Sequence, residues 1–396
     1  MLLFVVSQGR RHDNQSGRNM ERNSVGIVKE HTFTFGSEDD PLKLESGHTL
    51  WPVDIVYEMY GEPNEDRSNA IYLAHALSGD AHAAGYHHPN DKRTGWWDDM
   101  VGPGKPLDTN KYWFICSNII GGCKGSTGPG SINPKTGAQY CLDFPVITIG
   151  DMVDAQKRLI DHLGISKLHS IIGGSMGGFQ VLEWMIRYPD MYRSAISVAS
   201  SAKLTAQGLA FNAVGRNAIQ TDPGWENGCY YGRTGPVNGL SVARMIGHIT
   251  YLSEPSLDEK FGRKLQSADR YSYDLQPEFA VDSYLNYQGK SFTERFDANS
   301  YIYITKAMEY FDIARTYGPL EEAFSVVKGK TLIISYSSDW LFTTPQARDI
   351  VRALMTNALD VSFIEINSPY GHDAFLVEVE QLSRILVPFL ESAWDA

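Results

Sequence analysis

The sequence predicts an α/β protein with a mostly parallel sheet of eight strands, helices on both faces of that sheet, and an inserted helical lid. Three observations support this prediction. Short apolar runs alternate with helical segments along most of the 396 residues. One apolar run leads through a glycine-rich turn directly into a helix. The alternation stops between residues 201 and 330, where helical segments recur without convincing strands.

The eight strands are expected in apolar or alternating runs. They are Val25–Phe35, Pro52–Tyr60, Ala70–Leu77, Tyr112–Asn118, Leu168–Gly173, Ser194–Ala199, Thr331–Tyr336 and Val361–Ile366. No helical segment separates the first two runs, which predicts an antiparallel opening before parallel strands alternate with helices. The covering helices are expected at Ile149–Leu163, Met176–Tyr188, Pro345–Met355 and Ala374–Trp394.

These patterns divide the chain into three parts. Residues 1–24 are predicted to be a disordered extension, because residues 7–24 are polar, rich in arginine and without periodicity. Residues 25–200 and 331–396 form the predicted catalytic domain, and residues 201–330 form a helical lid between the sixth and seventh strands. The loop at 121–140 is rich in Gly, Pro, Ser and Asn and is long for a compact domain, which favours a role in shaping a site.

Composition excludes several classes of partner. The net charge is −12 and Lys and Arg form no stripe, so we expect neither nucleic acid nor an anionic membrane as a partner. No apolar run approaches the ~18 residues of a membrane span. The four cysteines form no C-x-x-C pair and are sparse, which predicts free thiols in a reducing, cytoplasmic setting. They are Cys116, Cys123, Cys141 and Cys229.

The strongest local motif is the segment Ser170–Gly178, where an apolar strand runs into G-x-S-x-G and then into a helix. This order is typical of the nucleophile elbow of the α/β-hydrolase fold, in which a serine hydroxyl projects at the start of a helix. Glycines two positions before and after Ser175 permit the sharp turn and the close approach of neighbouring chains. The motif identifies Ser175 as the candidate nucleophile.

The partners of Ser175 follow from chain order, since this fold places an acid and then a histidine after the serine. Downstream of Ser175 the chain has only His248, within a helical segment of the lid, and His372, in a Gly/Pro loop after the last strand. His372 therefore is the candidate base, and Asp339, at the end of a strand, is the candidate acid that orients it. We expect the backbone N–H groups of Met176 and Leu77 to stabilise an oxyanion.

Many further segments, taken together, resemble the homoserine O-acetyltransferases of the α/β-hydrolase superfamily, from Ser24 to the C-terminus. They are Ala76–Asp80 with His82, Gly95–Asp98, Gly102–Pro106, Cys116–Asn118, Gly121–Gly128, Ser131–Pro134, Gly173–Gly178, Ala243–Tyr251 and Tyr370–Leu376. The chain departs from the usual pattern at Ala81 and Ala83, beside the predicted oxyanion loop.

The resemblance implies acyl transfer from acetyl-CoA to the hydroxyl of L-homoserine, a step of methionine biosynthesis, by a ping-pong mechanism through an acyl-serine. It implies acetyl-CoA as a co-substrate without a separate cofactor, and a homodimer formed through lid helices. It also implies that Arg244 and Asp373 hold the carboxylate and the amine of the substrate. Tyr231 is expected to line the entrance of the site.

Alternatives on the same fold stay open at this point. They are homoserine O-succinyltransferase, serine O-acyltransferase, an esterase or thioesterase, and a catalytically inactive binding module. A metal site is not expected. His87 and His88 with Asp91 resemble a metal patch, but adjacent histidines on an extended loop rarely converge on one ion, and a solvated loop is favoured.

Overall fold

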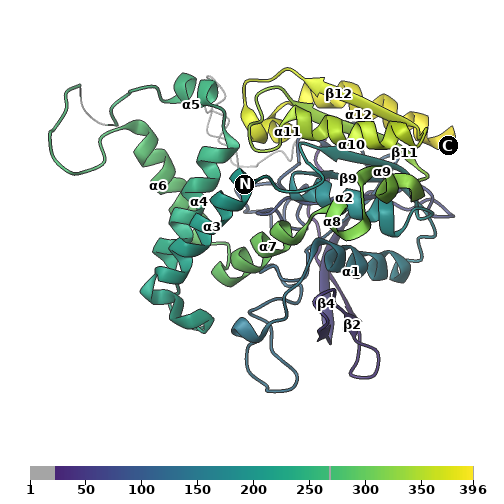
Figure 1. Cartoon of the computed structure of the whole chain (residues 1–396), viewed down its shortest axis with the longest axis horizontal. Coiled ribbons are helices and arrows are strands. Elements are labelled where there is room, and N and C mark those ends of the chain that lie inside the picture. The colour runs from purple at the N-terminus through teal and green to yellow at the C-terminus, as the bar shows by residue number, and fades with distance from the viewer. Residues whose placement is uncertain (1–22, 267–268, 396) are drawn as a thin grey trace.

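A computed structural model describes residues 23–266 and 269–395 of the chain. Most of the predicted disordered extension, residues 1–24, lies outside the described residues. The fold class is confirmed: an eight-stranded, mostly parallel sheet lies between helices, with the order β1-β4-β8-β5-β9-β10-β11-β12 (Figure 1). Its strands are β1 (His31–Phe35), β4 (Val53–Tyr60), β5 (Ala70–Ala74), β8 (Trp113–Ser117), β9 (Leu168–Gly174), β10 (Tyr192–Val198), β11 (Lys330–Tyr336) and β12 (Val361–Ile366).

The direction of the strands follows the predicted pattern. β4 runs antiparallel to both β1 and β8, and every later neighbouring pair is parallel. The antiparallel opening is therefore confirmed. Two short two-stranded ladders were not expected from the sequence, because each strand has only two residues. They join β2 (Leu42–Lys43) to β3 (Thr49–Leu50) and β6 (Val101–Gly102) to β7 (Leu107–Asp108).

Successive residues of the central strands pack on opposite faces of the sheet, as the two-residue period of a strand requires. In β9, Ile171 belongs to one hydrophobic core and Ile172 to the other. The first core contains side chains of α1 (Ile149–His162), α2 (Met176–Arg187) and α10 (Thr344–Thr356). The second contains side chains of α12 (Val379–Ser392). Helices on both faces thus bury the strands that carry the site.

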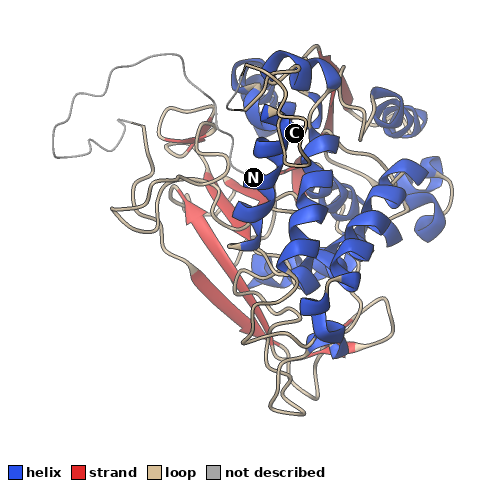
Figure 2. Cartoon of the chain, turned by 90° about the vertical axis from the view of Figure 1, so that its left-hand side faces the viewer, coloured by secondary structure: helices blue, strands red, loops and turns tan. Residues whose placement is uncertain are grey.

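Between β10 and β11 the described chain is helical. The helices are α3 (Ala206–Thr221), α4 (Val237–Tyr251), α5 (Glu254–Lys260), α6 (Ala280–Thr293), α7 (Ala298–Tyr310), α8 (Ile313–Tyr317) and α9 (Leu320–Ala323). The helices α3, α4, α5 and α6 lie together to one side of the sheet, on the left in Figure 1. In the view of Figure 2, turned by 90°, this helical side faces the viewer. The boundaries of a separate lid domain stay a prediction.

Two local predictions are wrong. The terminal helix expected at Ala374–Trp394 is interrupted, because Glu378 leaves the helical conformation between α11 (Ala374–Val377) and α12. The cysteines are not all free: Cys141 and Cys229 form a disulfide that joins the end of the 121–140 loop to the segment before α4. Their 88-residue separation gives no local signal of this pairing. Cys116 and Cys123 are free thiols, as expected.

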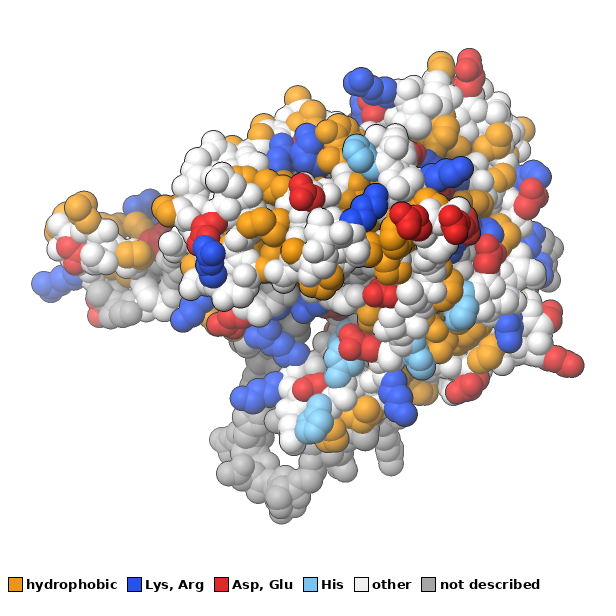
Figure 3. All heavy atoms as spheres, turned by 90° about the horizontal axis from the view of Figure 1, so that it is seen from below, with side chains coloured by type: hydrophobic (Ala, Val, Ile, Leu, Met, Phe, Trp, Pro, Cys, Tyr) orange, Lys and Arg blue, Asp and Glu red, His pale blue; other side chains and the backbone are white. Residues whose placement is uncertain are grey.

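The surface carries charges of both signs. On the face shown in Figure 3, Lys and Arg side chains are interspersed with Asp and Glu side chains. Among the described residues, no helix has the length and apolar character needed to cross a bilayer.

Candidate active site

Ser175 lies at the turn between β9 and α2, where the sequence predicts the elbow. Its backbone has a φ of 58° and a ψ of −126°, a conformation that residues other than glycine rarely adopt. The flanking glycines are needed for close packing, since a Cβ at Gly173 would meet the backbone of Gly177, and one at Gly177 would meet the backbone of Ala74. The turn therefore holds the Ser175 hydroxyl at the carboxyl end of the central strand.

The structure brings Ser175, His372 and Asp339 together. His372 Nε2 lies 2.8 Å from Ser175 Oγ, and His372 Nδ1 lies 2.8 Å from Asp339 Oδ2. All three side chains are buried. His372 lies in a single turn of 3-10 helix between β12 and α11, and Asp339 follows β11. Three residues that are up to 197 positions apart thus form one hydrogen-bonded chain.

Electrostatics support a proton transfer along this chain. Burial lowers the pKa of His372, but the charge of Asp339 and its hydrogen bond outweigh burial, and the pKa lies above its ordinary value. The other oxygen of Asp339, Oδ1, accepts hydrogen bonds from the N–H groups of Leu341 and Phe342, each at 2.9 Å. These bonds fix the carboxylate, which in turn orients the imidazole toward Ser175.

The predicted oxyanion donors lie beside Ser175. Met176 is the first residue of α2, so its N–H has no acceptor within the helix. Leu77 follows β5 and lines the same two pockets as Ser175. Both positions fit a site where two backbone N–H groups face a developing negative charge.

Two pockets meet at Ser175. The first spans about 470 Å³, part of it open to solvent, and is lined by residues that include Ser78, Trp96, His372 and Asp373. The second spans about 510 Å³ and is lined mainly by α3, α4 and α7, with apolar side chains such as Phe211 and Met308. A serine between two pockets can face two different substrates in turn.

Asp373 lies in the first pocket, next to His372 in the chain, as the sequence analysis expects for a group that holds an amine. Burial raises its pKa to about 6, against the lowering effects of His372 and Arg244. Arg244, on α4, is buried and donates from Nη1 to Ser78 Oγ at 3.2 Å. Ser78 lines the first pocket, whereas Arg244 contacts Ser78 from a neighbouring cavity and does not itself line the first pocket.

Comparison with known proteins decides the family. The α/β hydrolase fold family matches residues 69–379. A homoserine O-acetyltransferase of Methanosalsum zhilinae is 56% identical over 373 residues, covering 94% of this chain and 75% of that protein. The crystal structure of homoserine O-acetyltransferase from Bacillus anthracis has a TM-score of 0.84 and 32% identity, covering 92% of this chain and 98% of that one. The chain belongs to the homoserine O-acetyltransferase family.

Esterases share the fold of this acetyltransferase family closely. The crystal structure of one esterase has a TM-score of 0.83 and 30% identity to this chain, covering 92% of it and all of the esterase. The Ser–His–Asp arrangement therefore does not by itself separate transfer from hydrolysis. That distinction depends on the surroundings of Ser175.

One feature of this acetyltransferase-family chain was not predicted: a group of three arginines beside the first pocket. Arg93, Arg244 and Arg295 line a small cavity together with Phe292. Arg295 donates to the Ser78 carbonyl at 3.1 Å, and the Arg244 and Arg295 guanidinium groups lie 4.6 and 5.2 Å from the centre of the Phe292 ring. Burial and the charge of Arg244 lower the pKa of Arg295 to about 10.

The arginine group (Arg93, Arg244 and Arg295) carries more positive charge than nearby acids neutralise. Asp80 acts on Arg295 through space. However, within the described ranges no carboxylate oxygen is recorded within ion-pair distance of these three side chains, whereas many other arginines form such pairs. Like charges held together in a partly buried place favour an anionic ligand. The three positions are far apart in the sequence, so no local motif announces the group.

Two other sequence predictions concern Tyr231 and His87. Tyr231 lines neither of the pockets that meet at Ser175, and its hydroxyl donates to Asp297 at 3.2 Å while its ring packs on Tyr230. A role for Tyr231 at the entrance stays a prediction. The prediction of a solvated loop at His87, His88 and Asp91 is wrong for His87 alone. His88 and Asp91 fit that prediction, but the His87 ring contacts a buried carboxylate, that of Glu58.

Proposed function

We propose that this enzyme transfers an acetyl group from acetyl-CoA to the hydroxyl of L-homoserine through an acyl-Ser175 intermediate. The observation that carries the proposal is the hydrogen-bonded chain from Ser175 through His372 to Asp339, placed where two pockets meet. The homoserine O-acetyltransferases at more than half identity support the choice of substrates. The reaction places the enzyme in methionine biosynthesis.

In the first half-reaction, His372 Nε2 takes the proton of Ser175 as Oγ attacks the thioester carbonyl. The oxyanion that forms is stabilised by the N–H groups of Leu77 and Met176. The C–S bond then breaks, the CoA sulfur takes the proton from His372, and an ester on Ser175 remains. Asp339 stabilises the imidazolium throughout.

In the second half-reaction, His372 takes the proton of the homoserine hydroxyl, whose oxygen attacks the Ser175 ester. Collapse of the tetrahedral intermediate returns the proton to Ser175 Oγ and releases O-acetylhomoserine. In this proposal Asp373, which lines the first pocket, pairs with the ammonium of homoserine. Arg244, which lines the small neighbouring cavity and contacts Ser78, turns toward the carboxylate. The second pocket, with its apolar wall, suits the acyl chain and the arm of the donor.

Two further parts of the proposal concern the assembly and the location of the enzyme. Apolar side chains are exposed on the helices of the lid region, which supports a homodimer formed through these helices. They include Leu209 and Val214 on α3 and Val242 and Ile249 on α4. We also place the enzyme in the cytoplasm, where its substrates would be made. There, the Cys141–Cys229 pair would be exposed to reducing thiols.

A steady-state assay that crosses acetyl-CoA and succinyl-CoA with homoserine and serine tests the substrates. We expect acetyl-CoA with homoserine to have the highest kcat/KM. Parallel lines in double-reciprocal plots are expected for a ping-pong mechanism, whereas intersecting lines would contradict the acyl-enzyme. Preference for succinyl-CoA would reassign the donor and would direct attention to the arginine group.

Hydrolysis is the second candidate function, and the similarity to a solved esterase favours considering it. A hydrolase would release CoA from acetyl-CoA at the same rate with and without homoserine. A transferase would release it in a single burst, then wait for the acceptor. The buried position of Ser175, 7% exposed, favours transfer because it limits access of water to the ester.

A further inference from the structure

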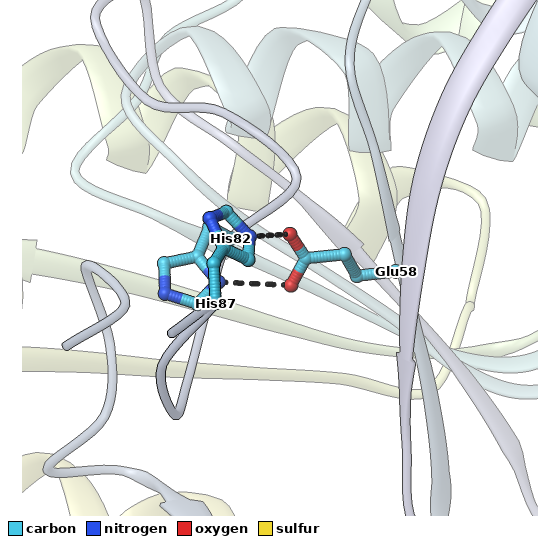
Figure 4. A group of neighbouring side chains, drawn as sticks. All are labelled: Glu58, His82 and His87. Carbon is cyan, nitrogen blue, oxygen red and sulfur yellow. Dashed lines mark hydrogen bonds and ion pairs between the residues drawn. The ribbon is translucent and has the colours of Figure 1, made fainter. Parts of the chain in front are cut away.

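A second polar cluster lies away from Ser175, on the far side of the loop that follows β5. Glu58 projects from β4, and His82 and His87 project from the loop, so that both rings face the carboxylate (Figure 4). His82 Nδ1 lies 2.9 Å from Glu58 Oε2, and His87 Nε2 lies 2.7 Å from Glu58 Oε1. None of the three residues lines a pocket that meets at Ser175.

The cluster combines deep burial with access from solvent. The Glu58 side chain is 0% exposed, whereas the side chains of His82 and His87 are 15% and 42% exposed. A carboxylate is costly to bury unless it is hydrogen-bonded and its charge is balanced. Here, the two imidazoles and the Tyr60 hydroxyl, 2.7 Å from Glu58 Oε2, surround it. No lysine or arginine is recorded as its ion-pair partner among the described residues.

We propose that Glu58, His82 and His87 bind one divalent transition-metal ion of the zinc class. The three ligand atoms lie within 4.8 Å of one another. Zinc binds imidazole nitrogen and carboxylate oxygen at about 2.0–2.2 Å in a tetrahedron, which separates neighbouring ligand atoms by about 3.3 Å. Each imidazole nitrogen already lies 2.7 or 2.9 Å from one of the two oxygens of Glu58. Binding would need the carboxylate to turn and the rings to shift until both nitrogens and one carboxylate oxygen surround the ion.

The donor set selects the class of ion. Two imidazoles with one carboxylate suit zinc and its first-row neighbours, whereas magnesium and calcium prefer an all-oxygen set. The exposed edge of His87 provides a path for the ion and leaves room for water as a further ligand.

The ion would have a structural role rather than a catalytic one. His82 lies five residues after Leu77, and the chain between them is tied to β4 by Tyr60, whose hydroxyl lies 2.8 Å from the Ala81 carbonyl. The same hydroxyl accepts a hydrogen bond from the Ala83 N–H at 2.7 Å. An ion that joins His82 and His87 to Glu58 would neutralise the carboxylate and fasten the loop to the sheet.

Binding is best tested on the full chain without a purification tag, after chelator treatment and dialysis. Calorimetric titration with Zn²⁺ should give one site per chain, and Mg²⁺ should give none. Titration with Co²⁺ should give the visible absorption bands of a tetrahedral site. His87→Gln should weaken Zn²⁺ binding at least 10-fold, while His88→Gln, which changes the neighbouring exposed histidine, should bind as the wild type does.

His87 is the residue to change first, because its side chain is partly exposed and contributes little to the core. The Tm of each metal-free variant shows whether folding is intact. Zn²⁺ should raise the Tm of the wild type and of His88→Gln, but not that of His87→Gln. Equal Zn²⁺ binding by the wild type and His87→Gln, or no binding by the wild type, would overturn the proposal. Loss of binding in His372→Gln but not in His87→Gln would assign the ion to the other site. These readouts do not depend on acyl transfer.

Discussion

The hydrogen-bonded chain at Ser175 and the arginine group that contacts Ser78 lie close together, but their charged side chains differ in how the protein partners them. In the first, His372 lies between Ser175 and Asp339, and Asp339 accepts two backbone hydrogen bonds. In the second, the buried Arg244 has a serine hydroxyl and aromatic rings as its recorded partners. The protein itself supplies every partner in the first group, whereas no ion pair to a carboxylate is recorded for the second among the described residues. We therefore expect changes to the first group to affect the reaction itself, and changes to the second to affect substrate binding.

The largest effect should come from breaking the first group at its nucleophile. Ser175→Ala removes the atom that carries the acyl group, and kcat should fall by about 10⁶. Mass spectrometry of protein incubated with acetyl-CoA should show a mass gain of one acetyl group in the wild type and none in the variant. Persistent acylation of Ser175→Ala would place the nucleophile elsewhere.

Changing Asp339 should cost activity and stability together. Asp339→Asn should reduce kcat by about 10⁴ by disfavouring the required tautomer of His372. Asp339→Ala should also lower the free energy of unfolding by about 1–3 kcal/mol, because the Leu341 and Phe342 N–H groups lose their acceptor. Chemical denaturation measures the second effect. Unchanged stability would mean that water replaces the carboxylate.

Changes to the arginine group should affect substrate binding more than kcat. Arg244→Ala should reduce kcat/KM for homoserine by up to about 100-fold, since hydrogen bonds to charged groups contribute about 1.5–3 kcal/mol. The KM for acetyl-CoA should change much less. Arg295→Gln is the matched comparison. It relieves the repulsion from Arg244 and should change the free energy of unfolding by less than about 1 kcal/mol. Equal effects of Arg244→Ala on both substrates would remove its role toward homoserine.

The smallest effect should appear in the pH dependence of the two half-reactions, because different groups titrate in each. The pKa of Asp373 is raised to about 6 by burial, so the carboxylate becomes protonated as pH falls through that value. The KM for homoserine should therefore rise below about pH 6, and Asp373→Asn should have a high KM at every pH. CoA release in the burst should follow His372 alone, whose raised pKa makes it lose the basic form at a higher pH than an ordinary histidine. An unchanged KM between pH 5 and 8 would exclude an ammonium contact by Asp373.

The sequence predicts best those features that have a local pattern. Ser175 follows a strand within G-x-S-x-G, Asp339 follows a strand, and His372 lies in a Gly/Pro loop after the last strand. Each position can be found without knowing the others, and the fold brings them within hydrogen-bond distance. The eight strands and the antiparallel opening follow from apolar runs in the same way.

Features that arise from contacts between distant segments were missed. The arginine group forms only where the loop before β6, α4 and the segment between α6 and α7 meet. The Cys141–Cys229 bond likewise forms only where a loop meets the segment before α4. Glu58 stands in β4, a mostly apolar strand whose other charged residue is Asp54, and no local pattern links it to His82 and His87.

Ser78 joins the two groups. Its hydroxyl accepts a hydrogen bond from Arg244 and its carbonyl accepts one from Arg295. Ser78 follows directly after Leu77, which lines both pockets at Ser175 and is the predicted oxyanion donor. With the proposed roles of these residues, an amino acid that binds either guanidinium would compete with Ser78 for it. We therefore expect binding of the acceptor to alter the position of the Leu77 peptide, and an inhibitor that displaces Ser78 would disturb acceptor binding and the acyl centre together.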